Sequence, residues 1–547
     1  MANYMRRNAT RNQRQVFGYA PTVRRPRSRF NRSHGHTTTF DGDYLIPVIR
    51  DMLLPGDTIN LKMKAFVRMA DLVRPFFTNV TLSFHCYVIP IRLVFPLIEK
   101  MFGAQDNPGD STSYVFPTMT SPSGGYAHDD LQAYWGVRQG VAGLTHHCLF
   151  DRAYNLTWKE HYRDQDLDDS PVIDTGEAAS DPADHVLLKR RKYKDYFTAA
   201  RPWLQKGTAV SLPLGTSAPL SGFPLMVDSG LAPTLENSGG SPTGAMRTQA
   251  SSGEMEMNGT GWGTNANLFW TNSELSVDLT QGATGPVDLP YADLTAATAA
   301  TLDELREAIA IQRRYEKDAR SGTRFTEIIK NTWGVDSPDQ RLQRPEYIGG
   351  ADFNIYVNPI AQTSQTSGAN ALGNLAAQGA TFHETRPIVR SIYEPSLLLG
   401  LISTRVDLVY QQRLPREMTY STRWDWHWPE FEHLSEQAIL NKEIFAQGTS
   451  ADDEVFGYTG RYNEWRTKES MITGKFNSDD SANLDEWTLA QDFDNLPTLS
   501  SEFVEEDAPY DRVVTVTSEP EFKGDFFFDY ICVRPISLDA TPGLPRI

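Results

Sequence analysis

The stretch that decides the fold reads Ile59-Asn60-Leu61-Lys62-Met63-Lys64-Ala65-Phe66-Val67-Arg68-Met69. Apolar side chains occupy every second position over these eleven residues, and most of the positions between them are polar. Successive side chains of a β-strand point to opposite faces, so this period of two predicts a strand with one buried face. The residues before it, 54–57 (Leu-Pro-Gly-Asp), have the composition of a turn.

Further strands are predicted on both sides of this one. Period two recurs over residues 80–88, and shorter runs predict strands at Arg405–Tyr410, Val513–Thr517 and Phe526–Val533. The 547 residues also include 39 glycines and 33 prolines without a fixed period, which favours a loop-rich, mainly β protein. Strands near both ends of the chain predict a β-sandwich whose first and last strands share one sheet.

The middle of the chain has a different character. Residues 216–298 contain eleven glycines, eight acidic residues and a single basic residue, Arg247. A stretch of this length without regular structure is usually functional or disordered, and we interpret it as a surface insertion. Just after it, Thr301 and Glu304 form a capping box. Charges that complement the helix dipole at both ends predict a helix over 301–320, with an inner side formed by Leu302, Leu305, Ile309 and Gln312.

Charge is divided unevenly along the chain. The formal net charge is −17, but residues 1–40 contain no acidic residue, and the remainder carries 43 basic and 69 acidic residues. The arginines of this N-terminal arm, defined as residues 1–33, are Arg6, Arg7, Arg11, Arg14, Arg24, Arg25, Arg27, Arg29 and Arg32. Arginines neutralise phosphates, and Tyr4, Phe17 and Tyr19 could stack on unpaired bases, so the arm predicts sequence-independent binding to nucleic acid. A solubilising tail and an organellar transit peptide are the alternatives.

A second basic cluster lies before the insertion and consists of Lys189, Arg190, Arg191, Lys192 and Lys194. Aromatic residues are interleaved with it or follow it: Tyr193, Tyr196, Phe197 and Trp203. One interpretation is a second contact with single-stranded nucleic acid, since bases stack on aromatic rings. The other is a solvated basic face above packed aromatic residues.

Motifs for catalysis, cofactors and metals are missing from the sequence. Gly474-Lys475 lacks the upstream glycine of a phosphate-binding loop, and no Gly-x-Ser-x-Gly elbow occurs. The pairs His34/His36 and His146/His147 have no third ligand nearby in the sequence, so they are more typical of polar surface than of a metal site. We therefore predict a protein that is not an enzyme and that has no cofactor and no metal.

A tryptophan-rich segment keeps one rival function open. It contains Trp424, Trp426, Trp428 and Phe431. Such a group could form the platform of a carbohydrate-binding or carbohydrate-cleaving β-sandwich. Packing in the core or in an interface is the interpretation that we favour.

Short motifs in a fixed order then point to a family. The first is residues 33–40 (Ser-His-Gly-His-Thr-Thr-Thr-Phe), and the densest block runs from Gly322–Ile328 to Arg341–Gly350. Others are Leu45–Pro47, Leu54–Thr58, Arg152–Asn155, Tyr162–Gln165, Asp195–Thr198, Pro202–Gly207, Phe456–Tyr458, Glu464–Arg466, Arg534–Pro535 and Pro542–Leu544. Together they resemble the gokushovirus-type major capsid proteins of the Microviridae, which are small single-stranded DNA phages. The set spans nearly the whole chain, and Arg201 and the ending Pro545-Arg546-Ile547 depart from the family pattern.

The resemblance implies an eight-stranded antiparallel jelly roll with long loop insertions and a few helices. Residues 34–547 would form one domain, with residues 216–298 gathered at three-fold protrusions. Sixty copies would build a T=1 virion shell around a circular single-stranded DNA genome, assembled in the cytoplasm of the host bacterium. The implied partners are further copies of the chain, a small basic DNA-binding protein, a minor capsid or pilot protein, and a receptor on the bacterial surface. A cytosolic nucleic-acid-binding scaffold that closes no shell remains an alternative.

Overall fold

The computed structural model describes residues 27–208, 210, 302–335, 343–361, 363, 375–434 and 436–539, and the backbone of short strands within 220–292. The chain divides into two compact units, one formed by Met1–Lys206 with Glu316–Ile547 and the other by Gly207–Tyr315. The second unit contains the strands β8 (Leu220–Ser221), β9 (Thr234–Glu236), β10 (Pro242–Thr248), β11 (Met255–Asn258) and β12 (Tyr291–Ala292). The rest of the predicted insertion, 216–298, lies outside the described residues.

The strand that decides the fold is β4 (Thr58–Met69), in the first unit. Its side chains alternate as predicted: Leu61 and Met63 are fully buried, whereas Lys64 and Arg68 are exposed. β4 pairs with β19 (Phe522–Arg534) along its whole length. The prediction that strands from the two ends of the chain share one sheet is therefore confirmed.

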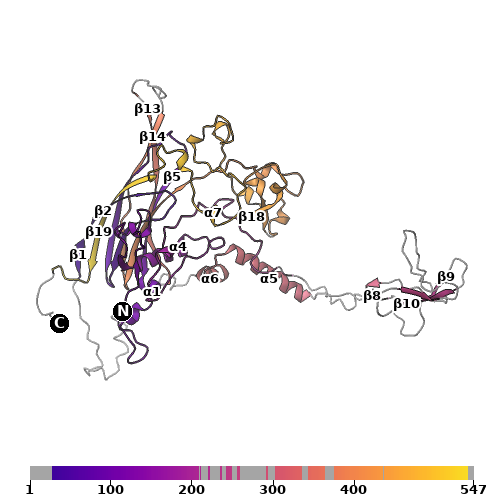
Figure 1. The fold of residues 1–547 in the computed structure, drawn as a ribbon, viewed down its shortest axis with the longest axis horizontal. Helices are drawn as coiled ribbons and strands as arrows, with labels where there is room; N and C mark the ends of the chain where they lie inside the picture. The colour runs from indigo at the N-terminus through magenta and orange to yellow at the C-terminus, as the bar shows by residue number, and fades with distance from the viewer. Residues whose placement is uncertain are drawn as a thin grey trace. The chain divides into compact units, whose positions relative to one another are not determined.

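Ten strands, paired antiparallel throughout, form the main sheet (Figure 1). The path β1-β19-β4-β14-β13-β5-β16-β3 adds β1 (Ser28–Asn31), β14 (Leu375–Glu384), β13 (Glu346–Ala361), β5 (Val80–Pro90), β16 (Ser396–Val406) and β3 (Ile46–Leu53). Off this path, β15 (Ile388–Ser391) pairs with β4, and β2 (His34–Phe40) pairs with β19. The mainly β jelly-roll fold is thus confirmed, with ten strands because β2 and β15 extend the main path of eight.

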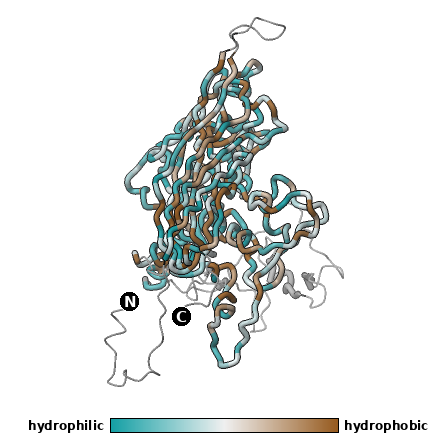
Figure 2. The backbone as a smooth tube through the Cα atoms, turned by 90° about the vertical axis from the view of Figure 1, so that its left-hand side faces the viewer, coloured by the Kyte–Doolittle hydropathy of each residue, from teal (hydrophilic) through white to brown (hydrophobic). Residues whose placement is uncertain are grey.

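The sheet curls back on itself. Phe84 on β5 and Phe528 on β19 lie four steps apart on the strand path. Four strand spacings would separate them by roughly 19 Å in a flat sheet. Their ring centroids are 6.4 Å apart, so the inner faces of the sheet pack against each other as in a sandwich. Figure 2 shows the apolar and polar residues that alternate along these strands.

A layer of helices covers the outer side of β16. Leu397 of this strand shares a buried cluster with Tyr154 of α4 (Leu149–His161), whereas Leu398 belongs to the sandwich core. A strand buried on both faces has a continuous apolar run instead of alternation. The prediction of a strand at Arg405–Tyr410 is therefore wrong in position. The true strand, β16 (Ser396–Val406), ends at Val406 and lacks the period-two signal.

Two other predictions need correction. Val513–Thr517 is not a strand, because the chain forms a 3-10 turn at Tyr510–Arg512 and then makes only an isolated bridge between Leu72 and Val514. Its apolar residues were the misleading signal, since Val513 is buried in the core from a loop. The helix predicted over 301–320 is confirmed as α5 (Leu302–Arg320), but its expected inner side is not buried, since Leu305 and Ile309 are 37% and 45% exposed.

The remaining elements are short. The helices are α1 (Ile91–Val94), α2 (Ile98–Met101), α3 (Leu131–Tyr134), α6 (Phe325–Trp333) and α7 (Ser501–Val504). Two small hairpins pair β6 (Thr118–Thr120) with β7 (Thr145–His147) and β17 (Gln437–Leu440) with β18 (Val455–Thr459). Within the described ranges, none of the helices has the length and apolar character needed to cross a bilayer.

A charged cluster, the Asp51 clasp, closes the curled sheet. Asp51 lies on β3, six steps along the strand path from β19. Its Oδ2 accepts hydrogen bonds of 2.8 Å from both the Tyr530 hydroxyl and Arg534 Nη2 of β19, and it also pairs with Arg32. Arg534 in turn pairs at 3.0 Å with the buried carboxylate of Asp57, in the turn before β4. The clasp thus joins β3, β19 and the chain that precedes β2.

A second polar group within the fold consists of the carboxyls of Asp43, Glu506 and Glu521. Glu521 and Glu506 each accept one backbone hydrogen bond, of 2.8 and 3.0 Å, and the second oxygen of Glu506 has no partner. Burial is the main cause that raises the pKa of Asp43 and of Glu521 to about 8 and that of Glu506 to about 7. The neighbouring cations Lys189 and Lys192 act in the opposite direction on Asp43 and Glu506 respectively.

Asp51→Asn tests the clasp. The substitution removes the charge that Arg534 and Tyr530 share, so the free energy of unfolding should fall by roughly 2–3 kcal/mol, the scale of hydrogen bonds to a charged group. Chemical denaturation of the purified protein measures this loss. The exposed Asp529→Asn on β19 is the control and should change stability by less than about 0.5 kcal/mol. Equal effects of the two substitutions would contradict the role of Asp51.

The stability of the folded protein should also decrease as the pH rises. A carboxyl whose pKa is raised by folding stabilises the folded state below its unfolded pKa, and this contribution is lost as the pH rises through the folded value. The melting temperature should therefore fall from about pH 5, just above the pKa of unfolded carboxyls, to about pH 8, the upper folded pKa, and should change little above it. Glu506→Gln should reduce this dependence, while the exposed Glu430→Gln should leave it unchanged. A pH-independent melting temperature would contradict the assignment.

Candidate functional site

The N-terminal arm enters the described structure at its last residues. Six of its nine arginines, Arg6, Arg7, Arg11, Arg14, Arg24 and Arg25, lie outside the described residues. Arg27 donates a 2.7 Å hydrogen bond from Nη2 to the Thr58 hydroxyl, Arg29 is exposed on β1, and Arg32 belongs to the Asp51 clasp. The end of the arm is therefore anchored, because β1 pairs with β19 at the edge of the sheet.

The second basic cluster is largely neutralised within the chain. Lys189 pairs with Asp507 at 3.2 Å, and Arg191 pairs with Asp168 and Glu505 at 2.7 and 2.9 Å. Arg190 is 5% exposed and donates to the Ser403 hydroxyl, while Lys192 is 7% exposed and donates to the Phe503 carbonyl at 2.8 Å. Lys194, with a side chain 57% exposed, pairs with Asp164. Burial of Arg190 and Lys192 does not fit a solvated basic face.

The backbone explains this pairing. The amide of Lys192 donates to the Val504 carbonyl at 2.9 Å, and the amide of Glu506 donates to the Arg190 carbonyl at 2.8 Å. The two segments therefore run antiparallel, and their opposite charges face each other. The interleaved aromatic residues Tyr196 and Phe197 are buried in a separate apolar cluster beside Phe503.

The tryptophan-rich segment lies at the surface of the chain. Trp424, Trp426 and Trp428 are 53%, 57% and 40% exposed, so they are not core residues of this chain. Trp426 meets Trp465 edge to face, with ring centroids 5.1 Å apart. The Arg423 guanidinium lies 4.0 Å from the centre of the Trp424 ring. We call Trp424, Trp426, Trp428 and Trp465, together with Arg423, the tryptophan surface. The sequence analysis did not include Trp465, because it is distant from the others in sequence.

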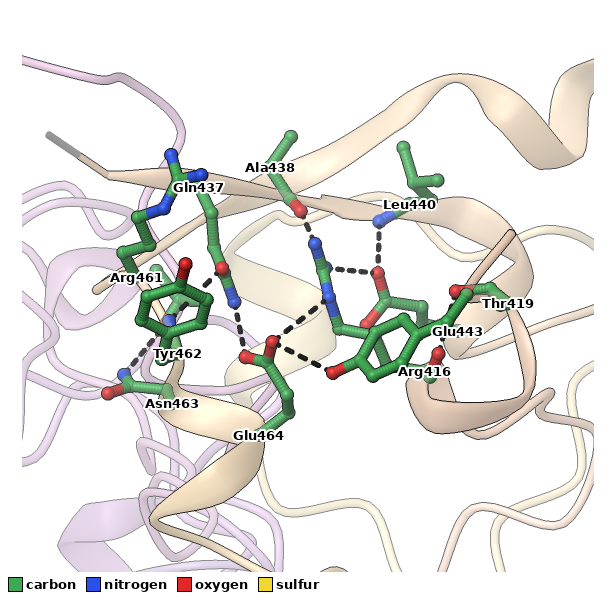
Figure 3. Close-up of polar contacts among 12 residues, drawn as sticks. Arg416, Thr419, Gln437, Ala438, Leu440, Glu443, Arg461, Tyr462, Asn463 and Glu464 are labelled. Atoms are coloured by element: carbon green, nitrogen blue, oxygen red, sulfur yellow. Dashed lines mark hydrogen bonds and ion pairs between the residues drawn. The ribbon is translucent and has the colours of Figure 1, made fainter. Parts of the chain in front are cut away.

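A polar network supports the tryptophan surface (Figure 3). Arg416 donates to the Ala438 carbonyl at 2.8 Å, pairs with Glu443 at 2.7 Å and lies 3.5 Å from Glu464. Glu464 also accepts hydrogen bonds from the Tyr420 hydroxyl and from the Gln437 amide. These contacts fix the backbone on either side of the tryptophans, because they join the segments 416–420, 437–443 and 464.

Tyr462, in the same network, has an unusual backbone conformation. Its φ of 65° makes it the one non-glycine residue with positive φ in the part of the chain that the structure describes. Its amide donates to Gln437 at 3.1 Å, and its hydroxyl accepts from the Trp428 amide at 3.2 Å. Such a conformation persists only where its surroundings impose it, which indicates that the tryptophan surface is held in a defined shape.

Three of the four histidines noted in the sequence come together in space. His34, His36 and His147 line one cavity of about 690 Å³ with Arg32 and Arg50. Among the described residues, no group of three or more His, Cys, Asp or Glu side chains could hold a metal ion. In this cavity the histidines lie with the cations Arg32 and Arg50 and with one carboxylate, Asp51, which the Asp51 clasp engages. Sequence spacing could not have shown this arrangement, since the residues lie on β2 and β7.

Comparison with known proteins places this fold in a family. A family model described as "Capsid protein (F protein)" matches residues 19–544. The chain is 40% identical to "Capsid protein VP1" of Bdellovibrio phage phiMH2K, with 98% of each chain covered. It is 37% identical to capsid protein VP1 of Chlamydia phage 1, covering 97% of this chain and 98% of the relative. It is 29% identical to capsid protein VP1 of Spiroplasma virus 4, covering 95% of this chain and 96% of the relative.

These matches agree with the ordered motifs and with the curled antiparallel sheet. The resemblance to capsid proteins of the Microviridae is therefore confirmed, and the protein is structural rather than enzymatic. Over almost its whole length, the chain belongs to the capsid protein family of these phages.

Proposed function

We propose that this chain is the major capsid protein of a small bacteriophage and that 60 copies form a T=1 icosahedral shell around a circular single-stranded DNA genome. The observation that carries the proposal is the end-to-end match: 98% of the chain aligns with 98% of a protein named capsid protein VP1. A rigid sandwich closed by the Asp51 clasp suits a building block that must keep its shape in many symmetric contacts.

Exposed aromatic residues supply surfaces for these contacts. The tryptophan surface is one, and Phe325 and Trp333, at the two ends of α6, are further aromatic residues with 75% and 68% exposure. Interface cores are enriched in aromatic residues, and such residues carry much of the binding energy. Many moderate contacts of this kind then sum to a stable closed shell. On this proposal, the tryptophans pack in interfaces between copies.

The basic arm is proposed to bind the DNA genome. Its nine arginines can neutralise phosphates without reading sequence, while the acidic remainder of the chain repels nucleic acid. The second basic cluster adds little to this proposal, since Lys194 is its most exposed member and the other charges are paired or buried. A small basic protein and a minor capsid or pilot protein would complete a particle assembled in the host cytoplasm.

Residues 216–298 are proposed to form protrusions at the three-fold axes that contact a receptor on the host bacterium. The support is their composition, rich in glycine and acidic residues and poor in bases. The described residues of the sandwich core come from outside this range, and connecting segments of this kind tolerate sequence variation.

The exposed tryptophans also favour a second candidate, a carbohydrate-binding β-sandwich. Negative-stain microscopy of the purified protein separates the candidates. A capsid protein should give uniform particles roughly 250–300 Å across, the size of a closed shell of about 60 chains at ordinary packing density. Monomers or small oligomers that bind glycans would contradict the proposal and support the carbohydrate candidate. Irregular complexes with DNA would support an open scaffold.

Deletion of residues 2–26 tests the role of the arm. It removes Arg6, Arg7, Arg11, Arg14, Arg24 and Arg25 but keeps β1 and the Asp51 clasp, so particles should still form. The DNA content per particle, measured from the ratio of absorbance at 260 and 280 nm, should fall because phosphate neutralisation is lost. A full-length variant with glutamine at these six positions separates charge from length. Unchanged DNA content in both variants would contradict a DNA-binding arm.

A further inference from the structure

Two neighbouring cavities beside β2 form one groove in the first unit. The first, of about 690 Å³, is lined by residues of β2 and β3 and by Trp135, His147 and Phe150. The second, of about 860 Å³, is lined by Phe66, Arg68 and residues of β2 and β19. The two share His36, Tyr134 and Gly136 in their linings, so they adjoin each other. We call this the β2 groove.

The lining of the β2 groove is rich in cationic and imidazole groups. It includes Arg32, Arg50, Arg68 and Lys523 against two acidic residues, Asp51 and Asp525. Four of the chain's 11 histidines also line it, namely His34, His36, His128 and His147. Asp51 is already engaged by the clasp, and Asp525 accepts a 3.0 Å hydrogen bond from Thr37. Arg32 and Lys523 are paired with Asp51 and Glu519, and burial lowers the pKa of His36 and His147, so Arg50 and Arg68 contribute most of the positive charge. In a chain of net charge −17, this local excess of cations over lining acidic residues favours an anionic occupant.

Aromatic rings lie beside the cations. Arg68 lies over the ring of Phe66, with its Cζ 4.9 Å from the ring centre. Arg50 lies 5.5 Å from the ring centre of Phe150, and its Nε donates to the Trp135 carbonyl at 2.8 Å. Phe66 is 36% exposed, so one edge or face of its ring remains accessible. Cations for phosphates beside rings for bases are the combination by which proteins bind single-stranded nucleic acid.

The groove is also continuous with the arm. Arg32, the last arginine of the arm, is itself part of the groove lining. β1 and β2, which follow the arm, both pair with β19 at the edge of the sheet (Figure 1). β2 itself carries no acidic residue. A segment of DNA bound by the arm would therefore reach the groove along β2 without meeting an acidic side chain of this strand. A basic peptide is a poor occupant, because the same cations would repel it.

We propose that the β2 groove binds a short segment of single-stranded DNA, with phosphates at Arg50, Arg68 and Lys523 and bases against Phe66 and Tyr134. This inference rests on the proposed function, since it gives the packaged genome a second contact besides the arm. It assigns part of the DNA binding to residues 32–68, 128–150 and 523–525, which only the folded chain brings together.

A pair of matched double variants tests the groove. In Arg68→Gln/Lys523→Gln, an arginine above an aromatic ring and an exposed lysine paired with Glu519 lose their charge. In the control Arg386→Gln/Lys468→Gln, an exposed arginine and an exposed lysine paired with Glu417 lose theirs, at positions that do not line the groove. Both pairs remove the same two charges from surface sites, so equal thermal stability is expected.

Affinity is measured with the purified full-length protein and a fluorescein-labelled oligothymidylate, by anisotropy over a range of salt concentrations. The loss of two phosphate contacts should lower the magnitude of the slope of log affinity against log salt by about 1.4. Relative to the native protein, the variant should therefore lose about 25-fold more affinity at 0.1 M salt than at 1 M salt. The control should retain the native slope. Equal slopes for the two double variants would overturn the groove assignment. If the groove variant does not fold, Phe66→Leu, which keeps every charge, should still weaken binding through lost stacking.

Ultraviolet cross-linking of DNA in purified particles separates this inference from the proposed function. DNA adducts on peptides that contain Phe66 or Tyr134, found by mass spectrometry, would support the groove. Particles that contain DNA but give adducts only outside the groove would overturn the groove and leave the capsid function standing. Particles without DNA would overturn both. Cross-links between Lys523 and an acidic peptide of a neighbouring copy would make the groove an interface and would also overturn the assignment.

Discussion

The closure of one antiparallel sheet upon itself is the constraint on which the rest of the structure depends. Strands β3 and β19 lie six steps apart on the strand path, yet Asp51 of β3 binds Tyr530 and Arg534 of β19 directly. Closure buries the apolar face of β4 and brings Phe84 to within 6.4 Å of Phe528. It also fixes where the N-terminal arm meets the sheet, because Arg32 shares the same carboxylate.

Basic residues that are clustered in the sequence and basic residues that are clustered only in space have different surroundings in this fold. Residues 189–194 form the densest basic run outside the arm, but they run antiparallel to 504–506, where Lys189 and Arg191 pair with Asp507 and Glu505. Arg190 and Lys192 are buried, and Lys194 pairs with Asp164. In contrast, the β2 groove collects cations and histidines from strands and loops that are hundreds of residues apart. Ion pairs and burial within the chain neutralise most of the first set. In the second set Arg32 and Lys523 are also paired, with Asp51 and Glu519, but the cations that line the groove outnumber the acidic residues that line it.

The core and the exposed surfaces of this protein have different roles. The core is closely packed and closed by buried polar contacts, which keeps the subunit rigid. The tryptophans at 424–428 and 465 lie outside it on a network centred on Arg416, so their positions are fixed although they are exposed. Rigid, exposed aromatic residues lose little conformational freedom on contact, which suits repeated symmetric interfaces.

Period-two alternation by itself determined β4 and β19, because each has one buried and one exposed face. It also determined β5, where residue polarity alternates although both faces of the strand are largely buried. The capping box and charge order determined α5, and the split between arginine-rich arm and acidic remainder was plain from composition. Only the tertiary structure decided the rest. β16 was displaced in the prediction because burial on both faces removes alternation, and Val513 misled because a buried loop is as apolar as a strand. The pairing of the second basic cluster, the exposure of the tryptophans and the β2 groove depend on contacts between distant segments, which local sequence does not encode.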